Sequence, residues 1–168
     1  MQDDAFWDTP VREPLVPRAG RRSRGNRVAT RVERVETRGR ARALQALYAA
    51  DLRDLTQLRR IATHVFDDLA VDPAERQFAS RLVATVADKC AELDADLARV
   101  TNNWRLERLG AIERSVLRLA AAELDRNETP VKVVLQEAVH LAERYGTTRS
   151  ARFVNGVLDA YARKLGRL

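Results

Sequence analysis

Apolar residues recur at intervals of three and four along most of the chain, which is the spacing of one face of an α-helix. The first run begins near Arg38, and a second covers residues 56–69. Asp72 followed by Pro73 predicts the start of a third helix, because Asp is a favoured N-cap and Pro a favoured first helical residue. The apolar spacing then continues to Val100 and leaves room for a bend near Asp88.

Three more helical runs are expected in the remaining sequence. Residues 101–103 read Thr-Asn-Asn and interrupt the pattern, and a run through residues 112–124 follows. Thr129-Pro130 predicts the next helix start, and Gly146 its end, since glycine is common just beyond a helix. A last helix is expected to begin near Ser150. We find no strand pattern, so the sequence predicts an all-α fold of about seven helices with short connections.

Composition separates an N-terminal extension from a folded domain. Residues 1–36 are rich in Pro, Gly, Ser and Arg and contain few large apolar side chains, so we expect them to be disordered. Residues 37–168 are expected to form one helical domain. Cys90 is the only cysteine, which excludes an intrachain disulfide and fits a cytoplasmic protein. No apolar run approaches the roughly 18 residues that a membrane span needs.

The positive charge of the chain is concentrated in one segment. Residues 18–42 contain ten arginines and two glutamates, a net charge of +8, whereas the whole chain carries +6. A segment of this kind indicates a polyanionic partner, because each neutralised phosphate releases a counterion. Arginine also binds phosphate through two parallel hydrogen bonds and stacks on exposed bases. The alternative is an ordinary solvated tail.

The sequence offers no pattern for catalysis, a metal or a cofactor. His64 and His140 are isolated from each other and from cysteines or carboxylates at metal-ligand spacing. No nucleophile–base arrangement, phosphate-binding loop or dinucleotide fingerprint is present. We therefore expect a binding protein that is not an enzyme.

Three separated strings resemble the NusB family of transcription antitermination proteins. They are ALQALY at residues 43–48, EAV at 137–139 and FVNGVLD at 153–159. The resemblance implies seven helices packed as two three-helix bundles with a connecting helix, and no enzymatic activity. It further implies binding to the boxA segment of ribosomal RNA transcripts as a heterodimer with NusE, a small-subunit ribosomal protein. The pair would join RNA polymerase antitermination complexes.

The resemblance also implies site residues in an arginine-rich motif, in the helix that follows it and around the start of the last helix. Arg149 stands where an acidic residue is frequent in the family, and about 36 residues precede the arginine motif instead of a few. The predicted RNA-binding residues are Arg38, Arg40, Arg42, Gln45, Arg149, Arg152, Phe153 and Asn155. The predicted partner-binding residues are Tyr48 and Glu113.

Several alternatives stay open from the sequence. Phe153 could stack on a base or pack in the core, and Gly156 fits tight packing between helices better than close approach to RNA. For the whole protein, the alternatives are a protein-binding scaffold without RNA and a detached RNA-binding module of an rRNA cytosine methyltransferase. The RNA hypothesis has one spatial requirement, which is that the N-terminal arginines and the Phe153 end of the last helix share an exposed surface.

Overall fold

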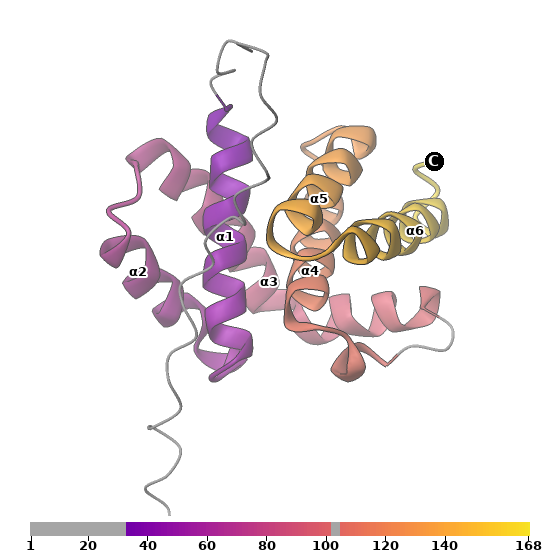
Figure 1. The fold of residues 1–168 in the computed structure, drawn as a ribbon, viewed down its shortest axis with the longest axis horizontal. Coiled ribbons are helices and arrows are strands. Elements are labelled where there is room, and N and C mark those ends of the chain that lie inside the picture. Colours follow the sequence, from indigo (N-terminus) through magenta and orange to yellow (C-terminus); the bar gives the residue numbers. More distant parts are fainter. Residues whose placement is uncertain (1–32, 102–104) are drawn as a thin grey trace, which may run out of the picture.

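The computed structural model describes residues 33–101 and 105–168, and within them it contains helices and no strand (Figure 1). Most of the predicted disordered extension, residues 1–36, lies outside the described residues. The α-helices are α1 (Val35–Asp51), α2 (Leu58–Asp68), α3 (Pro73–Val100), α4 (Ala111–Arg126), α5 (Val131–Tyr145) and α6 (Thr148–Lys164), with short 3₁₀ turns η1 (Leu55–Gln57) and η2 (Leu106–Arg108). The predicted all-α fold is confirmed.

Local capping explains where α3 and α6 begin. The Asp72 side chain accepts a hydrogen bond from the Ala74 backbone N–H at 3.0 Å, and Pro73 is the first helical residue, as predicted. Helix α6 begins at Thr148, two residues before the predicted start. Thr147 and Ser150 form a reciprocal capping box, in which each side chain accepts from the other residue's backbone N–H. Ser150 therefore belongs to the first turn of the helix.

A bend divides α3 into two segments. Lys89 has φ −119° and ψ 16°, outside the helical range, so the bend lies one residue from the expected position near Asp88. Counting the two segments separately gives seven α-helical segments in the described part of the chain, in line with the predicted number of about seven. At the bend, Lys89 Nζ lies 2.8 Å from Asp125 Oδ2 and connects α3 to the end of α4.

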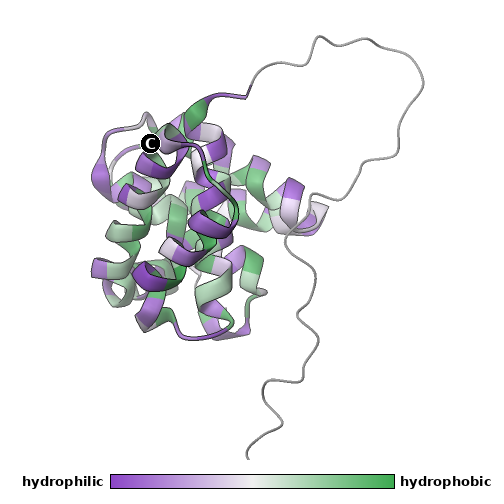
Figure 2. Cartoon of the chain, turned by 90° about the vertical axis from the view of Figure 1, so that its left-hand side faces the viewer, coloured by the Kyte–Doolittle hydropathy of each residue, from purple (hydrophilic) through white to green (hydrophobic). Residues whose placement is uncertain are grey.

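The helices form two groups of three that pack against each other. In Figure 1, α1, α2 and the first half of α3 form one group, and α4, α5 and α6 form the other. The second half of α3 runs beneath α4 and α6 in this view, so α3 as a whole connects the two groups. Apolar positions face the spaces between helices, and polar positions face outward (Figure 2).

Helix α4 is the most enclosed element. Ten consecutive residues, Ser115–Leu124, are buried, so this helix packs on all sides and occupies the centre of the molecule. Charged Arg118 and Glu123 are buried within this stretch and form ion pairs with other helices. None of the helices in the described ranges combines the length and apolar character needed to cross a bilayer.

Candidate nucleic-acid interface

Arg38, Arg42 and Gln45 follow one another along one side of α1, at helical spacings of four and three. Each is partly exposed. Arg38 Nε donates to Glu75 Oε1 at 2.6 Å, and Arg42 Nε lies 3.5 Å from Glu75 Oε2. Arg42 Nη1 also donates to Gln45 Oε1 at 3.1 Å. The hydrogen bond to Glu75 raises the pKa of Arg38, so this guanidinium stays charged at any pH at which the protein folds.

Arg40, which the sequence grouped with Arg38 and Arg42, lies in the interior. Its side chain is 5% exposed and binds Glu123 through both Nε, at 2.8 Å, and Nη2. Its guanidinium also lies 5.0 Å from the centre of the Phe78 ring. A residue two positions along a helix lies about 200° around the axis, so Arg40 faces inward where its neighbours face outward. The structure thus gives Arg40 a place in the packing between helices and not on the predicted RNA-binding surface.

The end of α5 lies beside the start of α1. Thr37 Oγ1 donates to Glu137 Oε1 at 3.0 Å, and Arg144 Nη1 lies 3.3 Å from Glu33 Oε1. Burial raises the pKa of Tyr145, while the nearby charges of Arg144 and Arg42 lower it in part. The last turn of α5 therefore lies beside the residues that lead into α1. Helix α6 starts three residues after Tyr145, which brings its first turns to the same region (Figure 1).

The first turns of α6 carry most of the remaining predicted RNA-binding residues. Arg149, Arg152 and Asn155 are exposed, and Phe153 is half-buried and packs against the core. Arg149 and Phe153 border a shallow hollow of about 250 Å³, whose other lining residues are Arg108, Leu109, Gly110, Glu113, Thr147 and Ser150. Phe153 thus combines core packing with a position at the surface.

Gly156 does not have the role expected from the sequence. A Cβ atom placed on this residue would meet nothing within 4 Å, so no neighbouring helix packs closely there. The prediction of tight helix packing at Gly156 is wrong. The close approach occurs instead at Gly39, where a Cβ would lie 2.8 Å from Phe78 Cδ1 and 3.2 Å from the Glu75 carbonyl oxygen.

The two predicted partner-binding residues lie at the same end of the molecule. Glu113, in the first turn of α4, accepts a hydrogen bond from the Ser150 hydroxyl and so sits beside the start of α6. Tyr48 is half-buried on α1, one turn before Asp51, which pairs with Arg114. Glu113 is therefore held close to the surface formed by Arg149 and Phe153.

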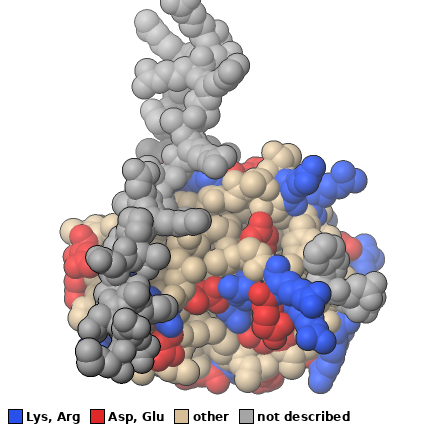
Figure 3. Space-filling model, turned by 60° about the horizontal axis from the view of Figure 1, so that its bottom comes forward, with Lys and Arg blue, Asp and Glu red and all other residues tan. Residues whose placement is uncertain are grey.

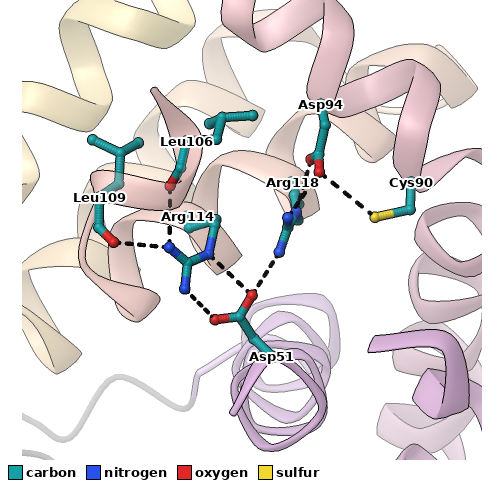
Figure 4. Close-up of polar contacts among 7 residues, drawn as sticks. All are labelled: Asp51, Cys90, Asp94, Leu106, Leu109, Arg114 and Arg118. Atoms are coloured by element: carbon teal, nitrogen blue, oxygen red, sulfur yellow. Dashed lines mark hydrogen bonds and ion pairs between the residues drawn. The ribbon is translucent and has the colours of Figure 1, made fainter. Parts of the chain in front are cut away.

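A network of ion pairs joins α1, α3 and α4 (Figure 4). Asp51 accepts hydrogen bonds from Arg114 at 2.5 and 3.0 Å and from Arg118 at 2.7 Å. Arg118 also binds both carboxylate oxygens of Asp94 at 2.8 Å. Burial by itself would raise the pKa of Asp51, but the two arginines lower it on balance. The network is a structural connection that the sequence analysis missed, although the spacing of Arg114 and Arg118 by one helical turn was a visible signal.

The Arg114 guanidinium and the Cys90 thiol, both part of this network, make further interactions. Arg114 Nη1 donates to the backbone oxygens of Leu106 and Leu109 at 3.1 and 2.9 Å, which fixes η2 against α4. Burial, with a smaller contribution from Asp94, raises the pKa of the Cys90 thiol. Cys90 therefore stays protonated near neutral pH and is a poor nucleophile. Within the described residues there is also no group of three potential metal ligands.

The predicted RNA-binding residues other than Arg40 are partly or fully exposed and lie in two places, along α1 and on the first turns of α6. Arg144, near the end of α5, lies 3.3 Å from Glu33, just before α1, and α6 begins three residues after α5 ends. In the view of Figure 3, positive side chains gather toward the right-hand edge, and both signs mix over the centre. An arrangement of exposed guanidinium groups with one half-buried aromatic ring suits a single-stranded nucleic acid, because it offers phosphate contacts and a surface for stacking.

Comparisons with known proteins show the family to which the chain belongs. The NusB family model matches residues 37–163. The transcription antitermination protein NusB of Sorangium cellulosum is 44% identical over 131 residues, which cover 77% of this chain and 93% of that protein. The NusB protein of Anaeromyxobacter dehalogenans (strain 2CP-1) is 42% identical over 135 residues, covering 75% and 89%.

Solved structures show the same fold. T. maritima NusB superimposes with a TM-score of 0.71 at 32% identity, covering 77% of this chain and 91% of that chain. A chain in the crystal structure of the antitermination factors NusB and NusE in complex with dsRNA gives a TM-score of 0.72 at 27% identity, covering 77% and 97%. From the family match and these identities, this chain belongs to the NusB family, whose members are transcription antitermination factors and not enzymes.

Proposed function

We propose that this chain is an RNA-binding antitermination factor that recognises boxA-type single-stranded RNA in ribosomal RNA transcripts. It would do so as a heterodimer with NusE and would join RNA polymerase antitermination complexes. One structural neighbour was solved with NusE and dsRNA, which supports a partnership of this kind for the present chain. The relatives that support it are antitermination proteins covered over most of their length, so the methyltransferase-module alternative gains no support.

The observation that carries the proposal is the exposure of arginines on both α1 and α6, which we propose form one surface. Arg38 and Arg42 are partly exposed on α1, and Arg149 and Arg152 are exposed on α6, with the end of α5 between them. In this proposal the four arginines bind phosphates and supply affinity. The half-buried Phe153 ring, with the Gln45 and Asn155 amides, contacts bases and supplies specificity. Arg40 acts indirectly, because its ion pair with Glu123 holds α1 against α4.

The proposed partner surface is the end of the molecule where Glu113 and Tyr48 lie. Glu113 would pair with a basic side chain of NusE, and its hydrogen bond with Ser150 connects that contact to the start of α6. RNA binding and NusE binding would thus occur at adjacent positions. NusE is therefore expected to raise RNA affinity.

The test is fluorescence anisotropy of a labelled boxA RNA titrated with the chain, with and without NusE, over a range of salt concentrations. Four phosphate contacts predict a slope of log affinity against log salt of roughly −3 for a single strand. Arg149→Ala with Arg152→Ala should weaken binding and bring the slope about 1.4 closer to zero, since each lost contact contributes about 0.7.

A matched control is Arg59→Ala with Arg60→Ala. These exposed arginines lie on α2, on the opposite side of the molecule from α6 in Figure 1, and their removal changes the net charge equally. The control should reduce affinity much less. Equal effects of the two double variants would show that net charge alone attracts RNA. Binding to NusE without any binding to RNA would favour the scaffold alternative.

A further inference from the structure

We propose that Glu75, in the first turn of α3, is a positioning residue of the RNA-binding surface and holds Arg38 and Arg42 ready for phosphate contact. The inference rests on the proposed function, because it assigns a role within the same surface. Glu75 would not touch RNA itself. It is an acidic residue, and neither the charge pattern nor the family resemblance pointed to it.

The geometry places one carboxylate between two arginines. Each Glu75 oxygen meets the Nε of a different guanidinium, at 2.6 Å for Arg38 and 3.5 Å for Arg42. The Glu75 side chain is only 8% exposed, whereas those of Arg38 and Arg42 are 33% and 32% exposed. The carboxylate is thus shielded from a ligand at the surface, while both guanidinium groups are accessible to one. Arg38 Nη1 also donates to the Glu33 backbone oxygen, and Arg42 Nη1 donates to Gln45 Oε1. Because an arginine has five N–H donors, each guanidinium still has donors left for phosphate.

Close packing of two helices creates this arrangement. Gly39 lies between Arg38 and Arg40 on α1 and contacts the first turns of α3 so closely that a Cβ would lie 3.2 Å from the Glu75 carbonyl oxygen. Asp72 caps the start of α3 and fixes the turn that carries Glu75. The glutamate therefore reaches α1 from a rigid element, which is the condition for effective positioning.

Positioning and simple electrostatics predict opposite effects of neutralising Glu75. If only net charge mattered, removing an acidic group beside two arginines would tighten RNA binding. If Glu75 holds the arginines, its loss frees two long side chains that must be ordered again when RNA binds. Ordering one mobile side chain costs about 0.5–1.5 kcal/mol, so freeing two should weaken binding by about 5- to 150-fold. The sign of the change separates the two explanations.

Two variants test the positioning role in the full chain. Glu75→Gln removes the charge, and Glu75→Asp keeps the charge but shortens the side chain by one methylene, so that it cannot reach both arginines. We expect both variants to weaken binding to labelled boxA RNA in fluorescence anisotropy. The matched control is Asp67→Asn, which removes an exposed acid on α2 that pairs with Arg76. It should leave affinity unchanged or slightly raised.

A third measurement separates positioning from general loss of structure. Arg38→Ala with Arg42→Ala removes the groups that Glu75 holds, so adding Glu75→Gln to this background should change RNA affinity no further. Thermal melting of every variant, followed by circular dichroism, sets an assay temperature at which all are folded. An equal loss from Glu75→Gln in both backgrounds would overturn the proposal, because the effect would then not pass through the arginines.

The remaining outcomes are also decisive. Tighter binding by Glu75→Gln with unchanged binding by Glu75→Asp would overturn the positioning role and leave the proposed function standing. Failure of the unsubstituted chain to bind boxA RNA, alone and with NusE, would overturn both. Weakening by both Glu75 variants that disappears in the double-arginine background would support the proposal.

Discussion

Neighbouring arginines on one helix have different physical roles in this protein. Arg38 and Arg42 point to the surface and are about one-third exposed, whereas Arg40 points between α1, α4 and α5. Buried Arg40 is matched by Glu123, with Glu137 3.8 Å away, so its charge is compensated inside the protein. Thr129 Oγ1 completes this group by donating to Glu123 Oε1 at 2.8 Å.

Replacing Arg40 by Ala should destabilise the protein by about 3–5 kcal/mol, because it leaves the Glu123 carboxylate buried without its partner. Urea denaturation followed by circular dichroism measures the change. The control Arg163→Ala removes an exposed arginine that pairs with Asp159 on the same helix, and should cost well under 1 kcal/mol. An Arg40→Ala protein as stable as the unsubstituted one, but unable to bind RNA, would return Arg40 to the group of direct RNA contacts.

The sequence could not separate the outward arginines from the inward one, for a clear reason. Charge counting treats every arginine in residues 18–42 alike, and the family resemblance identifies a motif without the direction of each side chain. The partners of Arg40 lie 83 and 97 residues away, in α4 and α5. Only the packing of those helices shows that two carboxylates meet there. The same limit applies to Glu75, whose importance depends on a contact between α1 and α3.

At the scale of the elements, short-range signals were reliable. Asp72 and Gly146 lie where α3 begins and α5 ends, as predicted. The cap of α6 is Thr147, not the expected Ser150, and Pro130 instead of Thr129 is the residue that precedes α5. The bend at Lys89 fell within one residue of the expected position. Contacts between helices could not be predicted from local sequence signals, because they depend on which residues of distant segments meet. The glycines illustrate the difference, since Gly39 rather than Gly156 lies at a close approach.

Identical substitutions at these two glycines should have opposite effects on stability. Gly39→Ala places a methyl group 2.8 Å from Phe78 Cδ1 and should destabilise the protein by about 1–3 kcal/mol through overpacking. Gly156→Ala enters open space within α6 and should stabilise it by up to about 1 kcal/mol, because alanine favours the helix. Thermal and urea unfolding of both variants checks the pair. Two changes of the same sign would contradict the packing described for α1 and α3.

At the scale of the whole molecule, buried and half-buried ion pairs connect the helical group that contains α1 to the group that contains α4. Asp51 of α1 pairs with Arg114 and Arg118 of α4, and Arg118 extends the network to Asp94 beyond the bend in α3. Arg40 and Glu123 make a second connection between α1 and α4. The predicted division into two bundles and a connecting helix was correct, but these connections define how the bundles are held.

The stability of the whole protein should therefore depend on the charge of Asp51. Its pKa is lowered in the folded state, so its contribution is complete above the unfolded value of about 3.9 and is lost as the pH falls through the lower, folded pKa. Asp51→Asn should reduce the free energy of unfolding at pH 7 by about 2–3 kcal/mol. It should also make acid unfolding less steep below pH 4.

Urea unfolding at a series of pH values measures this dependence. The control is Asp159→Asn, which removes an exposed carboxylate whose pair with Arg163 lies within one helix. The control should follow the pH profile of the unsubstituted protein. An Asp51→Asn profile that parallels the unsubstituted one down to pH 2 would exclude a special role for this carboxylate.

The position of α1 in one helical group and α6 in the other has a consequence for what the protein can select. A strand that contacts Arg38 and Arg152 at once must bridge both groups, whose separation is fixed by the network around Asp51. A fragment too short to bridge them gains only half of the contacts, whatever its base sequence. The number of nucleotides between contact points then becomes a criterion of recognition in its own right, and the rigidity of the protein interior sets how strictly that length is enforced.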